Sequence, residues 1–234
     1  MGESQEAGVM KKKAPALVAV NSDRLKRLLK KEPQLDGDID LRLHRAISWL
    51  KSAEQSSEDL RFISLWIAFN ACYAIDDLNE LAEERASEKS NIRDFLKNLE
   101  AKDEGGQLGK LLWDRFSNEI RILLNNKYIF QPYWNHLRGI ETEYETALQS
   151  SLNKASRFMS EGRVADLLYE VLTRLYVLRN QLFHGGATFQ GKVNRSQVKD
   201  GAAMLEKLVP VIIEIMIQNK QEDWGKASFP PVEE

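Results

Sequence analysis

The sequence predicts an all-α fold, a bundle of about eight or nine helices, from three observations. Through most of the chain, apolar residues recur at intervals of three and four, which places them on one face of a helix. Only 6 prolines and 13 glycines occur among 234 residues, which favours helices over many short strands. With 43% hydrophobic and 29% charged residues, the chain can bury one sizeable core. We therefore expect one helical domain over residues 17–225, with a disordered tail at 1–16 and a C-terminal tail at 226–234.

Three helices are expected in the first third of the chain. Ser22 and Asp23 can cap a short basic helix over residues 24–31. A second helix opens within the acidic residues 36–40. The third covers about residues 60–81 and is apolar on nearly all faces, so it should lie at the centre of the fold.

Asn70 interrupts this apolar helix. A buried amide needs hydrogen-bond partners. It can bond to backbone as a purely structural residue, which we favour, or it can face Arg179 and Asn180 on a later helix and help to orient them. Asn70 is therefore predicted as a supporting residue of the site described below.

The middle of the chain is expected to hold a surface helix over residues 87–100, a second helix over 109–125 and a peripheral helix over 141–158. Between the last two, periodicity breaks at Pro132 and an aromatic-basic cluster appears. The cluster contains Tyr128, Phe130, Tyr133 and Trp134, with Lys127, His136 and Arg138 nearby. Such side chains can stack RNA bases, or they can pin a loop to the core; we favour the pinned loop.

The next predicted helix, residues 161–184, has two distinct faces. Its apolar face carries Leu168, Val171, Leu175, Leu178 and Leu182. Its opposite face carries Thr173, Val177, Asn180 and His184, with Arg179 at the margin. Gly185-Gly186 should end the helix, since glycine readily adopts the left-handed backbone of a helix stop. Asn and His in this arrangement are not required for packing against the core, which indicates that this face has a function of its own.

The end of the chain is expected to form a loop and a last helix. The loop, residues 187–195, contains Lys192 and Arg195. These two cations are predicted to hold RNA phosphates beside His184; the alternative is a solvated loop. The last helix starts at Ser196, and its apolar surface exceeds one stripe, so the helix is central or meets a partner.

The run Arg179-Asn180-Gln181-Leu182-Phe183-His184 resembles the signature of the HEPN superfamily, in which an Arg, often followed by Asn, precedes a His near a helix end. Many HEPN proteins are metal-independent RNA endonucleases in which two protomers pack their motif helices into one composite site. The resemblance implies a HEPN-like core, a homodimer through the motif helix, and Arg179 and His184 as the catalytic pair. It implies Asn180 as their support, and Tyr176 is predicted as a supporting residue with Asn70.

This residue set suits cleavage of RNA by its own 2′-hydroxyl. A base must take the hydroxyl proton, an acid must protonate the leaving 5′-oxygen, and a cation must stabilise the charged transition state. Histidine titrates near neutrality, and arginine offers two donors to two phosphate oxygens. The expected products are a 2′,3′-cyclic phosphate and a 5′-hydroxyl, with no cofactor, because no cysteine or histidine spacing of a metal site is present.

The resemblance leaves the biological role open between several functions. A ribonuclease of this kind would serve in a toxin–antitoxin or phage-defence system, with an antitoxin protein as a possible partner. The alternatives are a non-catalytic HEPN module that binds RNA, a nucleotide or a partner protein, and an unrelated helical interaction protein.

Composition bounds these functions further. A formal net charge of -2 gives no overall attraction to nucleic acid, so RNA binding requires a local basic patch. The one cysteine, Cys72, excludes an internal disulfide and indicates a cytoplasmic protein; its apolar surroundings predict an inert buried thiol. No apolar stretch reaches the length of a membrane span, and no secretory signal is recognisable, so no membrane association is expected.

Overall fold

A computed structural model describes residues 21–35, 38–75, 84–115, 117–140, 143–192 and 194–229. Over these ranges the chain forms ten α-helices, one short 3₁₀ helix and no strand beyond a single bridge between Ile75 and Ala227. The all-α prediction is therefore confirmed, with slightly more helices than expected. The predicted tail at residues 1–16 lies outside the described ranges. None of the described helices has the length and apolarity required to cross a membrane.

The elements follow one another from α1 to α10. They are α1 (Ser22–Leu29), α2 (Asp38–Glu54), α3 (Glu58–Tyr73), α4 (Glu84–Lys102), α5 (Gln107–Arg115), α6 (Ser117–Asn125), η1 (Lys127–Ile129), α7 (Gln131–Leu137), α8 (Tyr144–Glu161), α9 (Val164–Phe183) and α10 (Arg195–Gln218).

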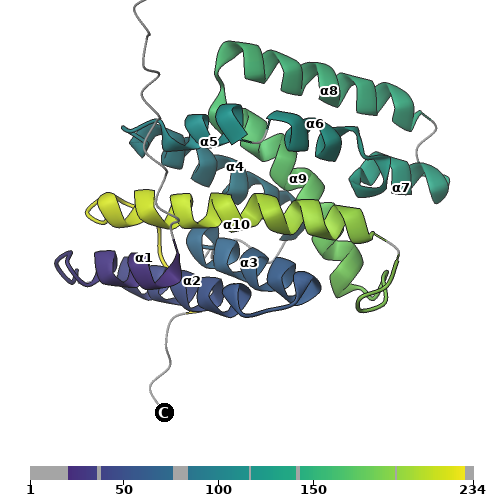
Figure 1. Cartoon of the computed structure of the whole chain (residues 1–234). Helices are drawn as coiled ribbons and strands as arrows, with labels where there is room; N and C mark the ends of the chain where they lie inside the picture. Colours follow the sequence, from purple (N-terminus) through teal and green to yellow (C-terminus); the bar gives the residue numbers. More distant parts are fainter. Residues whose placement is uncertain are drawn as a thin grey trace, which may run out of the picture.

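The last helix, α10, is the axis of the fold. Figure 1 shows it crossing the middle of the molecule, with α1, α2 and α3 on one side and α4, α5, α6 and α9 on the other; all seven contact it. Its broad apolar surface is buried on several faces, so of the two interpretations of that surface the central helix is correct. At Gly201 a Cβ atom would lie 3.0 Å from the Phe62 ring and 3.1 Å from Leu175, so glycine permits α10 to approach both α3 and α9 closely.

Several predicted helix boundaries require correction. The first helix begins at Ser22, and Asn21, one residue earlier than the predicted cap, accepts a hydrogen bond from the N–H of Arg24. The third helix ends at Tyr73 and not near residue 81, because Ala74 leaves the helical conformation. The helix predicted over residues 109–125 is two helices, α5 and α6.

The motif helix α9 is held along its length by α4. At its start, the Glu100 carboxylate accepts hydrogen bonds from the free N–H groups of Val164 (3.0 Å) and Ala165 (3.2 Å). Towards its end, Glu88 accepts a hydrogen bond from the hydroxyl of Tyr176 (2.9 Å). The carboxylates of Glu88 and Glu100, both in α4, therefore fix the position of α9.

The prediction of a loose C-terminal tail from residue 226 is wrong for residues 226–229. Ala227 is buried, and its N–H donates to the Asp38 carboxylate at 2.8 Å. The guanidinium of Arg45 donates to the carbonyls of Ser228 (3.1 Å) and Phe229 (2.8 Å). This segment is part of the domain.

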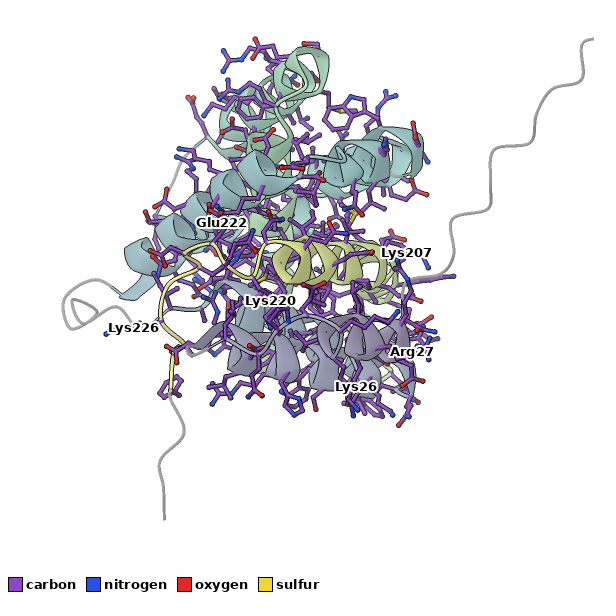
Figure 2. All side chains as sticks on the ribbon, turned by 90° about the vertical axis from the view of Figure 1, so that its left-hand side faces the viewer. Lys26, Arg27, Lys207, Lys220, Glu222 and Lys226 are labelled. Atoms are coloured by element: carbon purple, nitrogen blue, oxygen red, sulfur yellow. The ribbon has the colours of Figure 1, made fainter. Side chains whose placement is uncertain are left out.

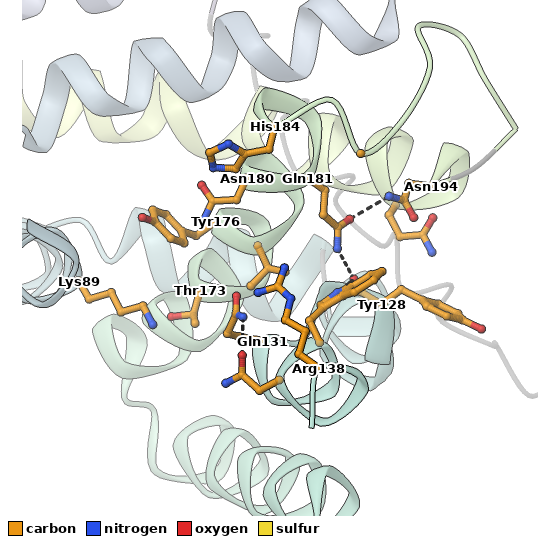
Figure 3. A pocket seen from close by; sticks show the side chains of 15 residues that line it. Lys89, Tyr128, Gln131, Arg138, Thr173, Tyr176, Asn180, Gln181, His184 and Asn194 are labelled. Carbon is orange, nitrogen blue, oxygen red and sulfur yellow. Dashed lines mark hydrogen bonds between the residues drawn. The ribbon is translucent and has the colours of Figure 1, made fainter. Parts of the chain in front are cut away.

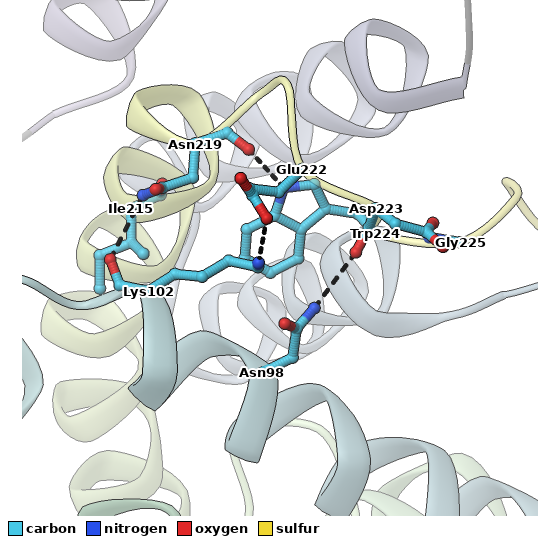
Figure 4. Close-up of polar contacts among 8 residues, drawn as sticks. All are labelled: Asn98, Lys102, Ile215, Asn219, Glu222, Asp223, Trp224 and Gly225. Carbon is cyan, nitrogen blue, oxygen red and sulfur yellow. Dashed lines mark hydrogen bonds and ion pairs between the residues drawn. The ribbon is translucent and has the colours of Figure 1, made fainter.

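The turn between α10 and that segment is bound to α4. Figure 4 shows Lys102 paired with Glu222 (2.7 Å) and Asn98 donating to the carbonyl of Asp223 (3.3 Å). The indole N–H of Trp224 donates to the carbonyl of Asn219 at 2.8 Å. We call residues 219–229 the C-terminal tie.

Arg42 of α2 is the buried centre of this tie. Its guanidinium donates to the carbonyls of Cys72, Trp224 and Gly225, and thereby joins the end of α3 to the tie. Burial lowers the pKa of Arg42. Burial raises the pKa of the adjacent Cys72 thiol to about 12, so the cysteine is the inert buried group that the sequence predicts.

In contrast to the buried Arg42, several cations on the outer surfaces of α1 and α10 are exposed to solvent. Lys26 and Arg27 of α1 and Lys207 of α10 point into solvent (Figure 2). Lys220, also labelled in Figure 2, is buried. Its ammonium group pairs with the Asp40 carboxylate (2.6 Å) and donates to the carbonyl of Pro33 (2.7 Å).

Candidate functional site

The motif helix ends as the glycines predict. Gly185 has a left-handed backbone with φ of 71° and donates to the carbonyl of Leu182 at 3.2 Å. Gly186 donates to the carbonyl of Gln181 at 2.7 Å, which completes a Schellman motif with His184 as the C-cap residue. The imidazole of His184 is therefore carried on a rigid helix terminus and is exposed to solvent.

A groove of about 870 Å³ lies along the outward face of this helix. Its floor consists of Thr173, Tyr176, Val177, Asn180 and His184, so four of the five follow the face predicted from the sequence. Figure 3 shows these side chains with walls from α4, α7 and the start of α10. Because the floor is covered by those walls, Val177 is only 5% exposed.

The groove is basic and amide-rich. Lys89 enters from α4 and Arg138 from the end of α7, and neither pairs with a carboxylate within the described ranges. No aspartate or glutamate is among the described residues that line the groove. Amides line it in their place: Gln131, Asn135, Asn180, Gln181, Asn194 and Gln197. In a chain of net charge -2, this is the local basic surface that contact with a polyanion requires.

Gln181 joins three elements around the groove. Its amide N–H donates to the carbonyl of Tyr128 at 2.6 Å, and its oxygen accepts from the amide of Asn194 at 2.8 Å (Figure 3). The same Tyr128 carbonyl accepts the indole N–H of Trp134 at 2.8 Å. The wall made by η1 and α7 is thereby fixed to α9, and α9 to the start of α10.

Our preferred interpretation of the aromatic-basic cluster, a loop pinned to the core by its aromatic residues, holds for Phe130 but not for Tyr128 or Trp134. Ile129 and Phe130 enter the core, but α7 has no buried residue and Tyr128 is 46% exposed. The break predicted at Pro132 is instead the start of a helix, since proline fits the first helical turn. Tyr128 and Trp134 consequently line the groove.

Arg179 does not line the groove with Asn180 and His184. Its guanidinium carbon lies 4.5 Å from the centre of the Phe183 ring, and it donates to the Asn180 side-chain oxygen at 2.9 Å. The motif arginine therefore stands behind Asn180 within one chain. Its predicted partner His184 is on the groove side, so the structure joins Asn180 with His184 and leaves Arg179 adjacent.

Tyr176 is bound into a polar network that begins in the core. Glu88 accepts hydrogen bonds from Tyr176 and from Tyr73, each at 2.9 Å. Burial, and after it the nearby Glu88 carboxylate, raises the pKa of Tyr73 well above its ordinary value. Burial and the hydrogen bond that Tyr176 itself makes to Glu88 raise the pKa of Tyr176. The supporting position predicted for Tyr176 thus has a physical counterpart, a tyrosine clamped one turn before Asn180.

Among the described residues, the Asn70 side-chain amide makes neither of the hydrogen bonds predicted for it. The oxygen of this amide is buried and accepts no hydrogen bond from the described residues, while the backbone carbonyl of Asn70 accepts from the N–H of Ala74 at 2.8 Å. Asn70 does not line the groove, so we assign it no role in the site.

Arg195 is used within the fold. It pairs with Asp59 and with Glu58 (3.3 Å) at the start of α3, and Asp59 also accepts the backbone N–H of Gln190 at 2.6 Å. This arrangement closes the loop after the motif and opposes the phosphate-binding role predicted for Arg195. Lys192 is exposed but does not line the groove.

The sequence left Lys89, Arg138 and Asn194 out of the site, because only packing brings α4, α7 and α10 to α9. Among the described residues, no three His, Cys, Asp or Glu side chains gather in a way that can hold a metal ion. Comparison of the chain with protein-family models, curated proteins and solved structures finds no match. The chemistry of the groove is therefore the basis for any functional proposal.

Proposed function

We propose that this protein is a metal-independent RNA endonuclease of the HEPN type, acting as a homodimer. The observation that carries the proposal is the groove in which His184 and Asn180 share a basic, amide-rich floor with Lys89 and Arg138 and with no described carboxylate. Such a surface attracts phosphates and presents one imidazole, a group that can accept and donate protons. RNA supplies the remaining reactant, its 2′-hydroxyl.

In the proposed reaction, one His184 takes the proton of the 2′-hydroxyl, and the oxygen attacks the adjacent phosphorus. The bond to the 5′-oxygen breaks as that oxygen receives a proton from the second His184 of the dimer. Arg179 and Asn180 stabilise and orient the charged phosphoryl group. The products are a 2′,3′-cyclic phosphate and a 5′-hydroxyl.

The end of α9 supports assembly through the motif helix. Phe183, beside His184, is 49% exposed, and Phe189 in the following loop is 63% exposed. Apolar rings next to a polar groove favour burial against a second copy, which would bring two His184 side chains and two Arg179 side chains to one site. Light scattering at micromolar concentration should give twice the 26.8 kDa chain mass.

The decisive experiment is cleavage of single-stranded RNA in the presence of a chelator. Activity should persist with the chelator and should disappear when the 2′-hydroxyl beside the cut is replaced by hydrogen. Loss of activity with chelator and recovery with magnesium would overturn the proposed chemistry. End-group analysis should find the cyclic phosphate.

A second candidate is a non-catalytic HEPN module that binds RNA. The placement of Arg179 favours it, because the guanidinium lies over Phe183 and on Asn180 and not on the groove. A dimer that protects RNA from other nucleases without cutting it would support this candidate. For the nuclease, a role in a toxin–antitoxin or phage-defence system predicts arrested growth on induced expression, relieved by a cognate antitoxin.

A further inference from the structure

We propose that the α7 wall of the groove, together with Lys89 of α4, is a subsite for one unpaired nucleotide of single-stranded RNA. The base stacks on Trp134, and the phosphate lies between Lys89 and Arg138. The proposal deepens the RNA-directed function above and rests on it for the identity of the polyanion. It assigns one base and one phosphate of that RNA to residues outside the motif.

The two cations face the groove from opposite walls. Figure 3 shows Lys89 and Arg138 extending towards the floor of α9, with Thr173 between them. Since no described carboxylate lines the groove, neither cation is neutralised there. A phosphate between these two side chains would be bound by the compact positive charge of the lysine and by the planar set of N–H donors of the arginine.

Trp134 is a preformed platform. Its indole N–H is bonded to the carbonyl of Tyr128, and its ring packs edge-on against Tyr133 with centroids 5.7 Å apart. Tyr133 in turn packs edge-on against Tyr128 at 5.6 Å and Tyr144 at 5.1 Å. The ring is thus held in place yet only half-buried, and it lines the groove. Base stacking on a fixed ring loses little entropy.

The platform has a fixed relation to the motif. The carbonyl that orients Trp134 also accepts the amide of Gln181, three residues before His184. A base on Trp134 and the imidazole of His184 therefore belong to one rigid groove of about 870 Å³, a size within the ~300–1,000 Å³ range of sites for small ligands. A base in a duplex is stacked on its neighbours and cannot enter, so the subsite selects unpaired RNA.

The test is the binding of a short fluorescein-labelled single-stranded RNA, followed by anisotropy, and of the same strand in a duplex. All variants are made in a His184→Ala background so that the RNA stays intact. Trp134→Ala should weaken single-strand binding by about 5- to 150-fold, the effect of one stacked base, and Trp134→Phe should restore most of it. Arg138→Gln and Lys89→Ala should each lower the slope of log affinity against log salt by about one unit.

Lys207→Ala is the matched control, because Lys207 is an exposed lysine of α10 that does not line the groove (Figure 2). It should leave both affinity and slope near those of the parent. Equal binding by the parent, Trp134→Ala and Arg138→Gln, or equal affinity for single strand and duplex, would overturn the subsite. Circular dichroism excludes variants that fail to fold. If Trp134→Ala is among them, Arg138→Gln and Lys89→Ala remain as tests of the subsite.

The outcomes separate this proposal from the nuclease. Cleavage by the wild-type chain that is unchanged in the Trp134 and Arg138 variants would leave the nuclease standing and remove the subsite. Single-strand binding that depends on these residues, without any cleavage, would remove the nuclease and leave the subsite. Binding of neither RNA form overturns the subsite in any case.

Discussion

The C-terminal tie and the groove contain similar side chains and use them in opposite ways. At the tie, Lys102 of α4 pairs with Glu222, and Arg42 of α2 bonds to four backbone carbonyls. In the groove, Lys89 and Arg138 meet no carboxylate among the described residues. Cations with internal partners hold the fold together, whereas cations without them remain available to a ligand. The location of partners therefore separates structural cations from candidate binding cations.

The same contrast occurs within α9, between two arginines five positions apart. Arg174 is 2% exposed, lies 3.9 Å from the centre of the Phe130 ring, and donates to Ser151 at 3.1 Å. Burial lowers its pKa to about 10. Arg179 is less buried, and within the described part of the chain its side-chain hydrogen bond and its ring contacts are all to residues of its own helix. We expect Arg174 to serve stability and Arg179 to serve the site.

The largest effect is expected at His184. His184→Ala removes the proton-transfer group and should lower RNA cleavage by about 10²- to 10⁴-fold. The side chain is exposed, so the melting temperature should change little. Initial rates on single-stranded RNA and a thermal melt of the same sample measure both quantities. Wild-type rates for this variant would remove His184 from the mechanism.

A mixing experiment sharpens this prediction for the dimer. Inactive Arg179→Ala and His184→Ala chains are combined under conditions that exchange subunits. Each mixed dimer retains one arginine and only one of the two histidines that the proposed reaction uses, so activity should return to a small part of the wild-type rate and no further. If the two residues act on one transition state, the double variant should be little worse than either single variant.

The apolar face of α9 could be predicted from the sequence, whereas its buried arginine could not. Helical periodicity places Leu168, Val171, Leu175 and Leu178 in the core, and all four are fully buried. It cannot find the buried Arg174, since the groups that satisfy that residue come from α6 and α8. The spacing of residues along one helix predicts which face is buried, but it does not predict which other helices will cover that face.

Some features of the candidate site could likewise be predicted from local sequence, and others depend on tertiary packing. The outward position of Asn180 and His184 and the glycine stop follow from local rules, and the structure agrees with both. The ion pairs of Arg195 and the walls of α4 and α7 depend on tertiary packing, so Arg195 was assigned to RNA and Lys89 was missed.

The second largest effect concerns pH and the buried end of α3. The thiol of Cys72 has its pKa raised by burial from 9.0 to about 12. The folded chain therefore holds this proton after the unfolded chain has released it, and stability falls as pH rises from 9 towards 12. The loss should reach about 4 kcal/mol, at about 1.4 kcal/mol per unit. Urea unfolding of wild type and Cys72→Ala across this pH range should show a shallower decline for the variant. Parallel curves would contradict the prediction.

Arg42→Ala tests the tie directly. It leaves the carbonyls of Cys72, Trp224 and Gly225 without their donor, so the free energy of unfolding should fall by about 3 kcal/mol. Urea unfolding at neutral pH measures this loss, and RNA cleavage by the folded fraction should persist. Arg138→Ala is the matched arginine of the groove, for which unfolding should shift by no more than about 0.5 kcal/mol.

The smallest effect separates the two regions most cleanly, because it compares two lysines of one helix. Lys102→Ala removes a pair with Glu222 at 2.7 Å, whose side chains are 16% and 44% exposed. A partly exposed ion pair contributes about 0.2–1 kcal/mol, so the free energy of unfolding should fall by that amount. The decrease should be smaller at high salt. Lys89→Ala removes a cation that has no ion-pair partner among the described residues, so stability should stay constant while RNA affinity falls. Equal destabilisation by both substitutions would mean that Lys89 is committed to the fold and that the groove is not the free basic surface inferred from it.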